Sequence, residues 1–166
     1  MARESVGVAA RSSVPAEAKL ALLEVLQRCT DTATAAQTAV DWLVAHTGAE
    51  KTVFAAPDNI RGTLGCIAGA GVTPKQFKRF CLSLDDPTHP LISALSNGRV
   101  VSFQDGRDAR VTLFGSEGFT AVKVARGDDE PALGLMLVGP AIEPPYGTAR
   151  WVADSLASCL GRMATR

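Results

Sequence analysis

The sequence has no excess of either charge. Its 166 residues include 17 Lys and Arg against 17 Asp and Glu, so the formal net charge is zero. A nucleic-acid-binding domain is expected to show a basic excess or a stripe of Lys and Arg on one face. Because neither is present, we expect no direct binding of DNA or RNA.

Long apolar runs are also missing. Stretches such as Leu133 to Val138, interrupted by Gly134, are far shorter than the ~18 residues that indicate a membrane span. The N-terminal residues contain no apolar core of the length found in signal peptides. The sequence therefore predicts a cytoplasmic protein with no membrane partner.

Cysteine and histidine occur without the spacings that bind metals or support catalysis. No Cys-x-x-Cys pair is formed by the four cysteines, and the two histidines have neither zinc-type spacing nor a neighbouring Ser and Asp set. These residues are Cys29, Cys66, Cys81, Cys159, His46 and His89. We therefore expect no metal site, no hydrolase activity, and free thiols in a reducing compartment.

Apolar periodicity predicts several helices. Leu22, Leu26 and Cys29 recur at helical spacing within a segment that begins at Pro15, and a second segment ends at Gly48, which suits a left-handed cap. A last helix is expected from Thr148 to Ala164, and shorter ones after residues 73 and 89.

Six short runs of β-forming residues lie between these helices, at 52–56, 64–68, 81–84, 100–103, 119–125 and 132–138. The expected architecture is α+β, with a central antiparallel sheet of about five to six strands flanked by helices. Residues 1–14 are expected to be a flexible tail and 15–166 a single domain. The stretch 104–118 is long for a loop in such a domain, and long loops often carry function.

This order of elements resembles the GAF domain, a sensory relative of the PAS domain with a profilin-like sheet. The matching stretches are Gly48-Ala49, His89-Pro90-Leu91 with Ala94-Leu95, Gly98-Arg99-Val100-Val101, and Leu133 to Val138 as the last strand. The resemblance covers about Leu20 to Met163. It implies a non-enzymatic regulatory module of a bacterial signal-transduction protein, such as a histidine kinase or a transcriptional activator.

The resemblance also implies a ligand pocket between the sheet and the helices of residues 77–95. The candidate lining residues are Phe54, Cys66, Phe80, Cys81, His89, Phe103, Phe119 and Lys123. Apolar walls with few polar groups are typical of small-molecule sites. The alternative for each aromatic side chain is ordinary core packing, which would leave the pocket collapsed.

Two of these residues have specific alternatives. Lys123 stands where the family usually has a Pro-Leu pair, and a lysine that points into the pocket would favour an anionic ligand. Strand alternation allows the opposite, with Val122 and Val124 forming the apolar face and Lys123 in solvent. His89 either contacts a ligand or caps and braces the helix that starts at Pro90.

No cofactor is identified by the family's own motifs. The Asn-Lys-x-Phe-Asp-Glu string of cyclic-nucleotide-binding members is absent, and no cysteine has the adjacent histidine of bilin-binding members. The spacing of Cys66 and Cys81 does not match the methionine-sulfoxide-reducing members. A redox sensor that uses Cys66 and Cys81 remains an alternative, with Cys81 favoured by the nearby Lys78 and Arg79.

The first and last helices are expected to pair and to form a homodimer that responds to ligand. The candidate dimer residues are Leu22, Leu26, Val152, Leu156, Cys159 and Met163. The same stripe could instead serve only the core of its own domain. A ligand-free interaction module that works by dimerisation is therefore the rival function.

Overall fold

The computed structural model describes residues 14–97, 100–105, 107, 110, 113–114, 117–140 and 146–164. The expected N-terminal tail lies outside these residues, apart from Val14. In chain order the elements are α2 (Ala16–Arg28), α3 (Thr32–His46), β1 (Lys51–Asp58), β2 (Thr63–Ala70), α4 (Pro74–Arg79), β3 (Cys81–Ser83), α5 (Pro90–Asn97), β4 (Val100–Phe103), β5 (Phe119–Val124), β6 (Gly134–Gly139) and α6 (Tyr146–Ala164).

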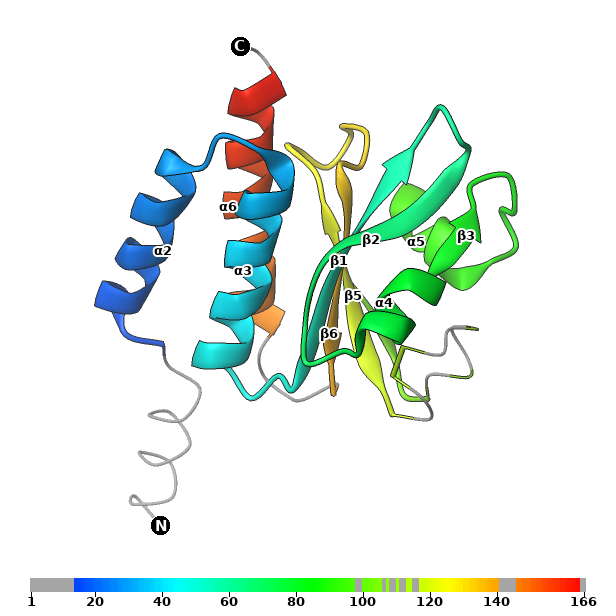
Figure 1. Cartoon of the computed structure of the whole chain (residues 1–166), viewed down its shortest axis with the longest axis horizontal. Helices are drawn as coiled ribbons and strands as arrows, with labels where there is room; N and C mark the ends of the chain where they lie inside the picture. Colours follow the sequence, from blue (N-terminus) through cyan, green and yellow to red (C-terminus); the bar gives the residue numbers. More distant parts are fainter. Residues whose placement is uncertain are drawn as a thin grey trace.

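A single six-stranded sheet forms the middle of the molecule, with the strand order β3-β2-β1-β6-β5-β4. All five neighbouring pairs are antiparallel. Figure 1 shows α2, α3 and α6 on one side of the sheet and α4 and α5 on the other. The α+β class with an antiparallel sheet and flanking helices is therefore confirmed.

Local side-chain chemistry explains the boundaries of α3 and the start of α4. Asp31 caps α3 by accepting a 2.8 Å hydrogen bond from the backbone N–H of Thr34. Thr73 and Gln76 form a reciprocal capping box at the start of α4. The expected left-handed cap at Gly48 is wrong: α3 ends at His46, and the cap residue Thr47 donates both its hydroxyl and its N–H to the carbonyl oxygen of Leu43.

Two separate hydrophobic cores lie on the two faces of the sheet. The helix-layer core joins α2, α3 and α6 to sheet residues such as Phe54, Val122 and Met136. The α5-side core joins α5 to sheet residues such as Phe119 and Leu135. All six residues of β6 are buried as a result. A central strand covered on both faces is expected to be apolar throughout, as β6 is.

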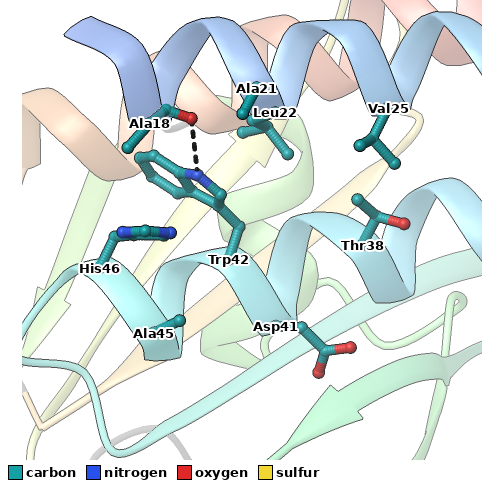
Figure 2. A pocket seen from close by; sticks show the side chains of 9 residues that line it. All are labelled: Ala18, Ala21, Leu22, Val25, Thr38, Asp41, Trp42, Ala45 and His46. Carbon is teal, nitrogen blue, oxygen red and sulfur yellow. Dashed lines mark hydrogen bonds between the residues drawn. The ribbon is translucent and has the colours of Figure 1, made fainter. Parts of the chain in front are cut away.

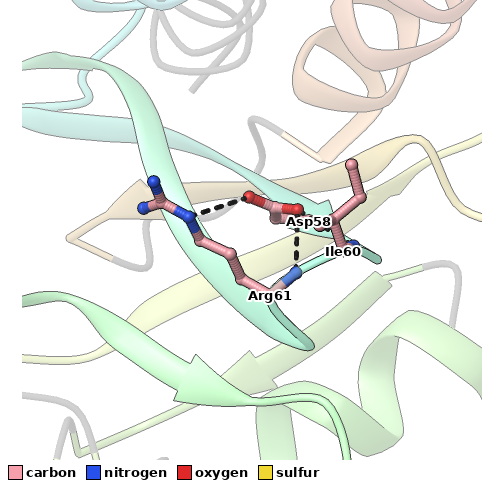
Figure 3. Close-up of polar contacts among 3 residues, drawn as sticks. All are labelled: Asp58, Ile60 and Arg61. Carbon is pink, nitrogen blue, oxygen red and sulfur yellow. Dashed lines mark hydrogen bonds and ion pairs between the residues drawn. The ribbon is translucent and has the colours of Figure 1, made fainter.

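A tight turn closes the β1–β2 hairpin. Oδ1 of Asp58 accepts hydrogen bonds from the N–H groups of Ile60 and Arg61, at 3.1 and 3.2 Å, and Nε of Arg61 lies 3.8 Å from Oδ2 (Figure 3). Gly62 adopts the positive φ of 69° that the turn requires. Among the residues described, no helix has both the length and the apolar character needed to cross a membrane.

Candidate functional site

A row of four residues crosses the centre of the sheet on the α5 side. Lys123 of β5 pairs with Leu135 of β6, Leu135 pairs with Ala55 of β1, and Ala55 pairs with Cys66 of β2. Leu135 and Ala55 belong to the α5-side core, and Cys66 packs against it. The row therefore ends in an ammonium group at one side and a thiol at the other.

Lys123 shares its face of β5 with Phe119 and Ala121. Those two residues belong to the α5-side core, and side chains alternate along a strand, so Lys123 lies on the same side. Its side chain is half-buried. The alternative that placed Lys123 in solvent assumed that only the face of Val122 and Val124 is buried. The opposite face of the sheet, on which Lys123 lies, is covered by the α5-side core as well.

Stacked aromatic rings form one end of the same face. The ring of Phe119 stacks on Phe103 at 5.1 Å and on Phe114 at 4.6 Å between centroids. Phe80 is also buried in the α5-side core. Phe114 was missed by the sequence interpretation, although an apolar Leu113-Phe114 pair inside a polar, glycine-rich loop was a signal for it.

Phe54 departs from the sequence interpretation. It is fully buried in the helix-layer core, on the face of the sheet opposite to Phe80 and Phe119. A Cβ added at Gly134 would lie 2.5 Å from Cζ of Phe54, which shows how closely the ring covers that glycine. Placing Phe54 in one pocket with the other aromatic residues was therefore an error about its face, because residue type does not reveal which face a strand residue occupies.

His89 braces the beginning of α5. Its side chain is 8% exposed, and Nδ1 accepts a 3.2 Å hydrogen bond from the backbone N–H of Leu91. Burial lowers the pKa of His89; the Arg110 guanidinium acts in the same direction, while the Asp86 carboxylate and a hydrogen bond to the Arg110 backbone oppose it. These contacts describe a neutral imidazole that holds a helix start, which is the bracing alternative.

Cys66 and Cys81 point to opposite faces of the sheet. Cys81 pairs with Gly65, the residue before Cys66, and adjacent strand residues face opposite ways. Cys66 is half-buried, and burial raises the pKa of its thiol to about 12, whereas Cys81 is exposed. A disulfide between them would require rebuilding the β2–β3 ladder, so this arrangement argues against a redox pair.

The terminal helices pair with each other inside one chain. α2 contacts α3 and α6, and Sγ of Cys159 donates a 3.2 Å hydrogen bond to the carbonyl oxygen of Leu26. Five of the six candidate dimer residues are buried in the helix-layer core: Leu22, Leu26, Val152, Leu156 and Cys159. The sixth, Met163, is half-buried and packs against the same core. These side chains serve the domain's own core, so assigning them to a dimer interface was incorrect.

Exposed apolar side chains instead lie on the outer part of α2. Leu20, Leu23 and Val25 are 58%, 36% and 45% exposed. Val25 and Leu22 also line a surface groove of about 460 Å³ between α2 and α3 (Figure 2). In this groove Nε1 of Trp42 donates a 3.1 Å hydrogen bond to the carbonyl oxygen of Ala18.

The sequence matches no family model, and no curated protein matches it either. Solved structures do match. A methyl-accepting chemotaxis protein is 16% identical with a TM-score of 0.75, over 91% of this chain and 100% of that one.

Two GAF domains show the same likeness. One, from an Acinetobacter phosphoenolpyruvate-protein phosphotransferase, is 12% identical with a TM-score of 0.72, over 90% of this chain and 93% of that one. The other, from a GAF domain/HD domain protein of Geobacter sulfurreducens, is 15% identical with a TM-score of 0.68, over 85% and 99%. Together with the six-stranded sheet and its two helical layers, these likenesses show that the chain has the fold of a GAF domain.

Proposed function

We propose that this chain is a sensory regulatory module that binds a small anionic molecule on the α5 side of its sheet. The observation that carries the proposal is the position of Lys123, a half-buried cation on the same face as Phe119 and Leu135. An apolar surface with one charged group is typical of sites that bind and orient a small molecule.

An anion at this position would balance a charge that the fold partly removes from water. A half-buried ammonium loses part of its hydration, and an oxyanion partner restores that stabilisation. Partly buried apolar side chains packed on the same core, such as Val101, Phe103 and Leu82, would then contact the rest of the molecule. The site thus favours a ligand with one anionic end and one apolar end.

The same strand gives ligand binding a route to the terminal helices. Val122 and Val124 of β5 pack in the helix-layer core, while Lys123 lies between them in sequence and faces the other side. α6 contacts β5 directly. A ligand that binds two arrangements of β5 with different affinity would therefore shift the packing of α6, which is the requirement for signalling.

Similar solved structures support a sensory role. They include the methyl-accepting chemotaxis protein and the chromophore-binding domain of a bacteriophytochrome. At sequence identities of 16% and 13%, these likenesses establish only a shared fold, so the sensing function of this chain remains our proposal.

Native mass spectrometry of the full chain, followed by denaturing mass spectrometry, tests the proposal. We expect an additional mass that denaturation removes, and we expect the Lys123→Ala variant to lose it. The matched control is Lys75→Ala, which removes an exposed lysine on α4. Equal occupancy in Lys123→Ala and the parent, or no bound mass in the parent, would contradict the proposed site.

A second candidate function is an interaction module that dimerises through α2. The specific observation is that three of the four exposed large hydrophobic residues of the described chain, Leu20, Leu23 and Val25, lie on this one helix. We expect the parent to sediment as a dimer and Leu23→Glu as a monomer. Ile60→Glu, at a 98% exposed position in the β1–β2 turn, is the control and should leave the dimer intact. A parent that sediments as a monomer would exclude this candidate.

A further inference from the structure

Two opposite charges lie on one exposed stripe of α2. Glu17 is in the first turn of the helix and Arg28 in the last, and both side chains are exposed. Because eleven residues separate them, they lie only about 20° apart around the helix and about 16 Å apart along its axis. Among the residues that the structure describes, neither side chain forms an ion pair or a hydrogen bond.

The outer face of α2 consists of this stripe and the adjacent Leu20 and Leu23. These two side chains are 58% and 36% exposed, whereas Leu22 and Leu26 are the only buried residues of the helix. Figure 1 shows α2 at the outer side of its layer, with α3 and α6 toward the sheet. The outer face therefore combines exposed apolar area with one charge at each end.

We propose that the outer face of α2 pairs with the same face of a second copy of this chain in the antiparallel direction. The pairing rests on the second candidate function, dimerisation through α2, and specifies its orientation. The two-fold axis of such a pair passes between positions 22 and 23, so Glu17 of each copy meets Arg28 of the other. Leu20 and Leu23 lie near this axis and fill the centre of the interface.

Charge complementarity favours this direction over the parallel one. A parallel pair in register would place Glu17, Glu24 and Arg28 each against its own copy, and like charges repel. The antiparallel pair has two Glu–Arg contacts instead, and it places Glu24 against the uncharged Ala21. Because exposed ion pairs contribute little affinity, the apolar side chains supply most of the binding free energy and the charges set the orientation.

Sedimentation equilibrium of the full chain and of charge-reversal variants tests the orientation. We expect a dimeric parent whose dissociation constant rises about tenfold in Arg28→Glu, because two attractive contacts become repulsive ones. The double variant Glu17→Arg/Arg28→Glu restores opposite charges and should return the dissociation constant to the parent value. This rescue cannot come from a more stable α2, because both substitutions oppose the helix dipole. Lys75→Glu, which reverses an exposed charge on α4, is the matched control and should dimerise like the parent.

Disulfide cross-linking reports the same orientation independently, in a Cys81→Ser background that removes the exposed native thiol. Oxidation should join two copies of the Glu17→Cys/Arg28→Cys variant. Glu17→Cys alone should not cross-link, because the two copies of position 17 would lie about 16 Å apart, too far for a disulfide.

Each failure has its own signature. A monomeric parent would overturn the pairing together with the second candidate function, and it would leave the anion site at Lys123 standing. A dimeric parent that Arg28→Glu does not weaken, or that the double variant does not rescue, would overturn the antiparallel direction alone. Efficient cross-linking by Glu17→Cys alone would do the same. Circular dichroism of each variant verifies that the fold is retained.

Discussion

The backbone N–H of Leu91 donates a hydrogen bond to Nδ1 of His89, and a ring nitrogen that accepts a hydrogen bond carries no proton. Protonation of His89 would break this bond and place a charge in a buried position. Because burial lowers the pKa of His89 below its ordinary 6.5, the unfolded chain binds a proton more readily than the folded one.

The free energy of unfolding should therefore depend on pH through His89. The contribution is fully present above pH 6.5 and is lost as the pH falls below 6.5 toward the lowered pKa of the folded state. Urea unfolding at pH 8 and pH 5 measures this difference. His89→Gln should reduce it, and His46→Gln, at an exposed histidine, should retain it. An unchanged pH dependence in His89→Gln would contradict the bracing role.

Gly134→Ala should destabilise the protein by about 1–3 kcal/mol, the usual cost of overpacking. The new Cβ would lie 2.5 Å from the carbonyl oxygen of Ala55 and 2.5 Å from Cζ of Phe54, both inside the sheet and its helix-layer core. Gly147→Ala on α6 is the control, since a Cβ there meets no atom within 4 Å. Chemical denaturation gives both values; a neutral Gly134→Ala would show that β6 can shift.

Leu156→Ala should cost about 2–5 kcal/mol of unfolding free energy, because Leu156 is fully buried between the helices and the sheet. Leu23→Ala should change stability by only about 0.5 kcal/mol, as its side chain is partly exposed on α2. The comparison distinguishes a side chain of the core from one of the outer surface. The loss of unfolding free energy in Leu156→Ala should be the same at low and at high protein concentration.

Cys81 should react with a thiol reagent first, before the other three cysteines. It is exposed, whereas Cys29 and Cys159 are buried and the pKa of Cys66 is raised to about 12. Reaction with Ellman's reagent near neutral pH should show one fast thiol, which Cys81→Ser removes. A fast phase that persists in Cys81→Ser would contradict the placement of Cys66.

Much of the fold could be predicted because its signals are local. The helical spacing of Leu22 and Leu26 predicts a helix from the local sequence alone. Thr73 followed by Pro74 predicts a helix start, which the capping box of α4 confirms. The strand β4 matches its predicted bounds, whereas β1 continues past its predicted end at residue 56, and Pro57 pairs with Leu64 inside the β1–β2 ladder. Strand ends depend on the partner strand, which local sequence does not reveal.

The candidate site could be predicted only in part, because it depends on which face each strand residue occupies. Phe54 and Lys123 were hard to place since both faces of the sheet are covered. The continuous apolar run of β6 was the available signal for this double burial. Phe114 reaches Phe119 from a loop, so this contact follows no helical or strand period.

The central claim is that a small anion binds on the α5 side of the sheet, and NMR tests it most directly. Methyl and amide spectra are recorded of the protein as purified and after denaturation and refolding have removed the bound molecule. We predict shift changes at Lys123, Leu135, Ala55 and Cys66, with much smaller ones at Met136 and Val138 on the opposite face. Identical spectra, or changes confined to Met136, Val138 and α3, would contradict the account.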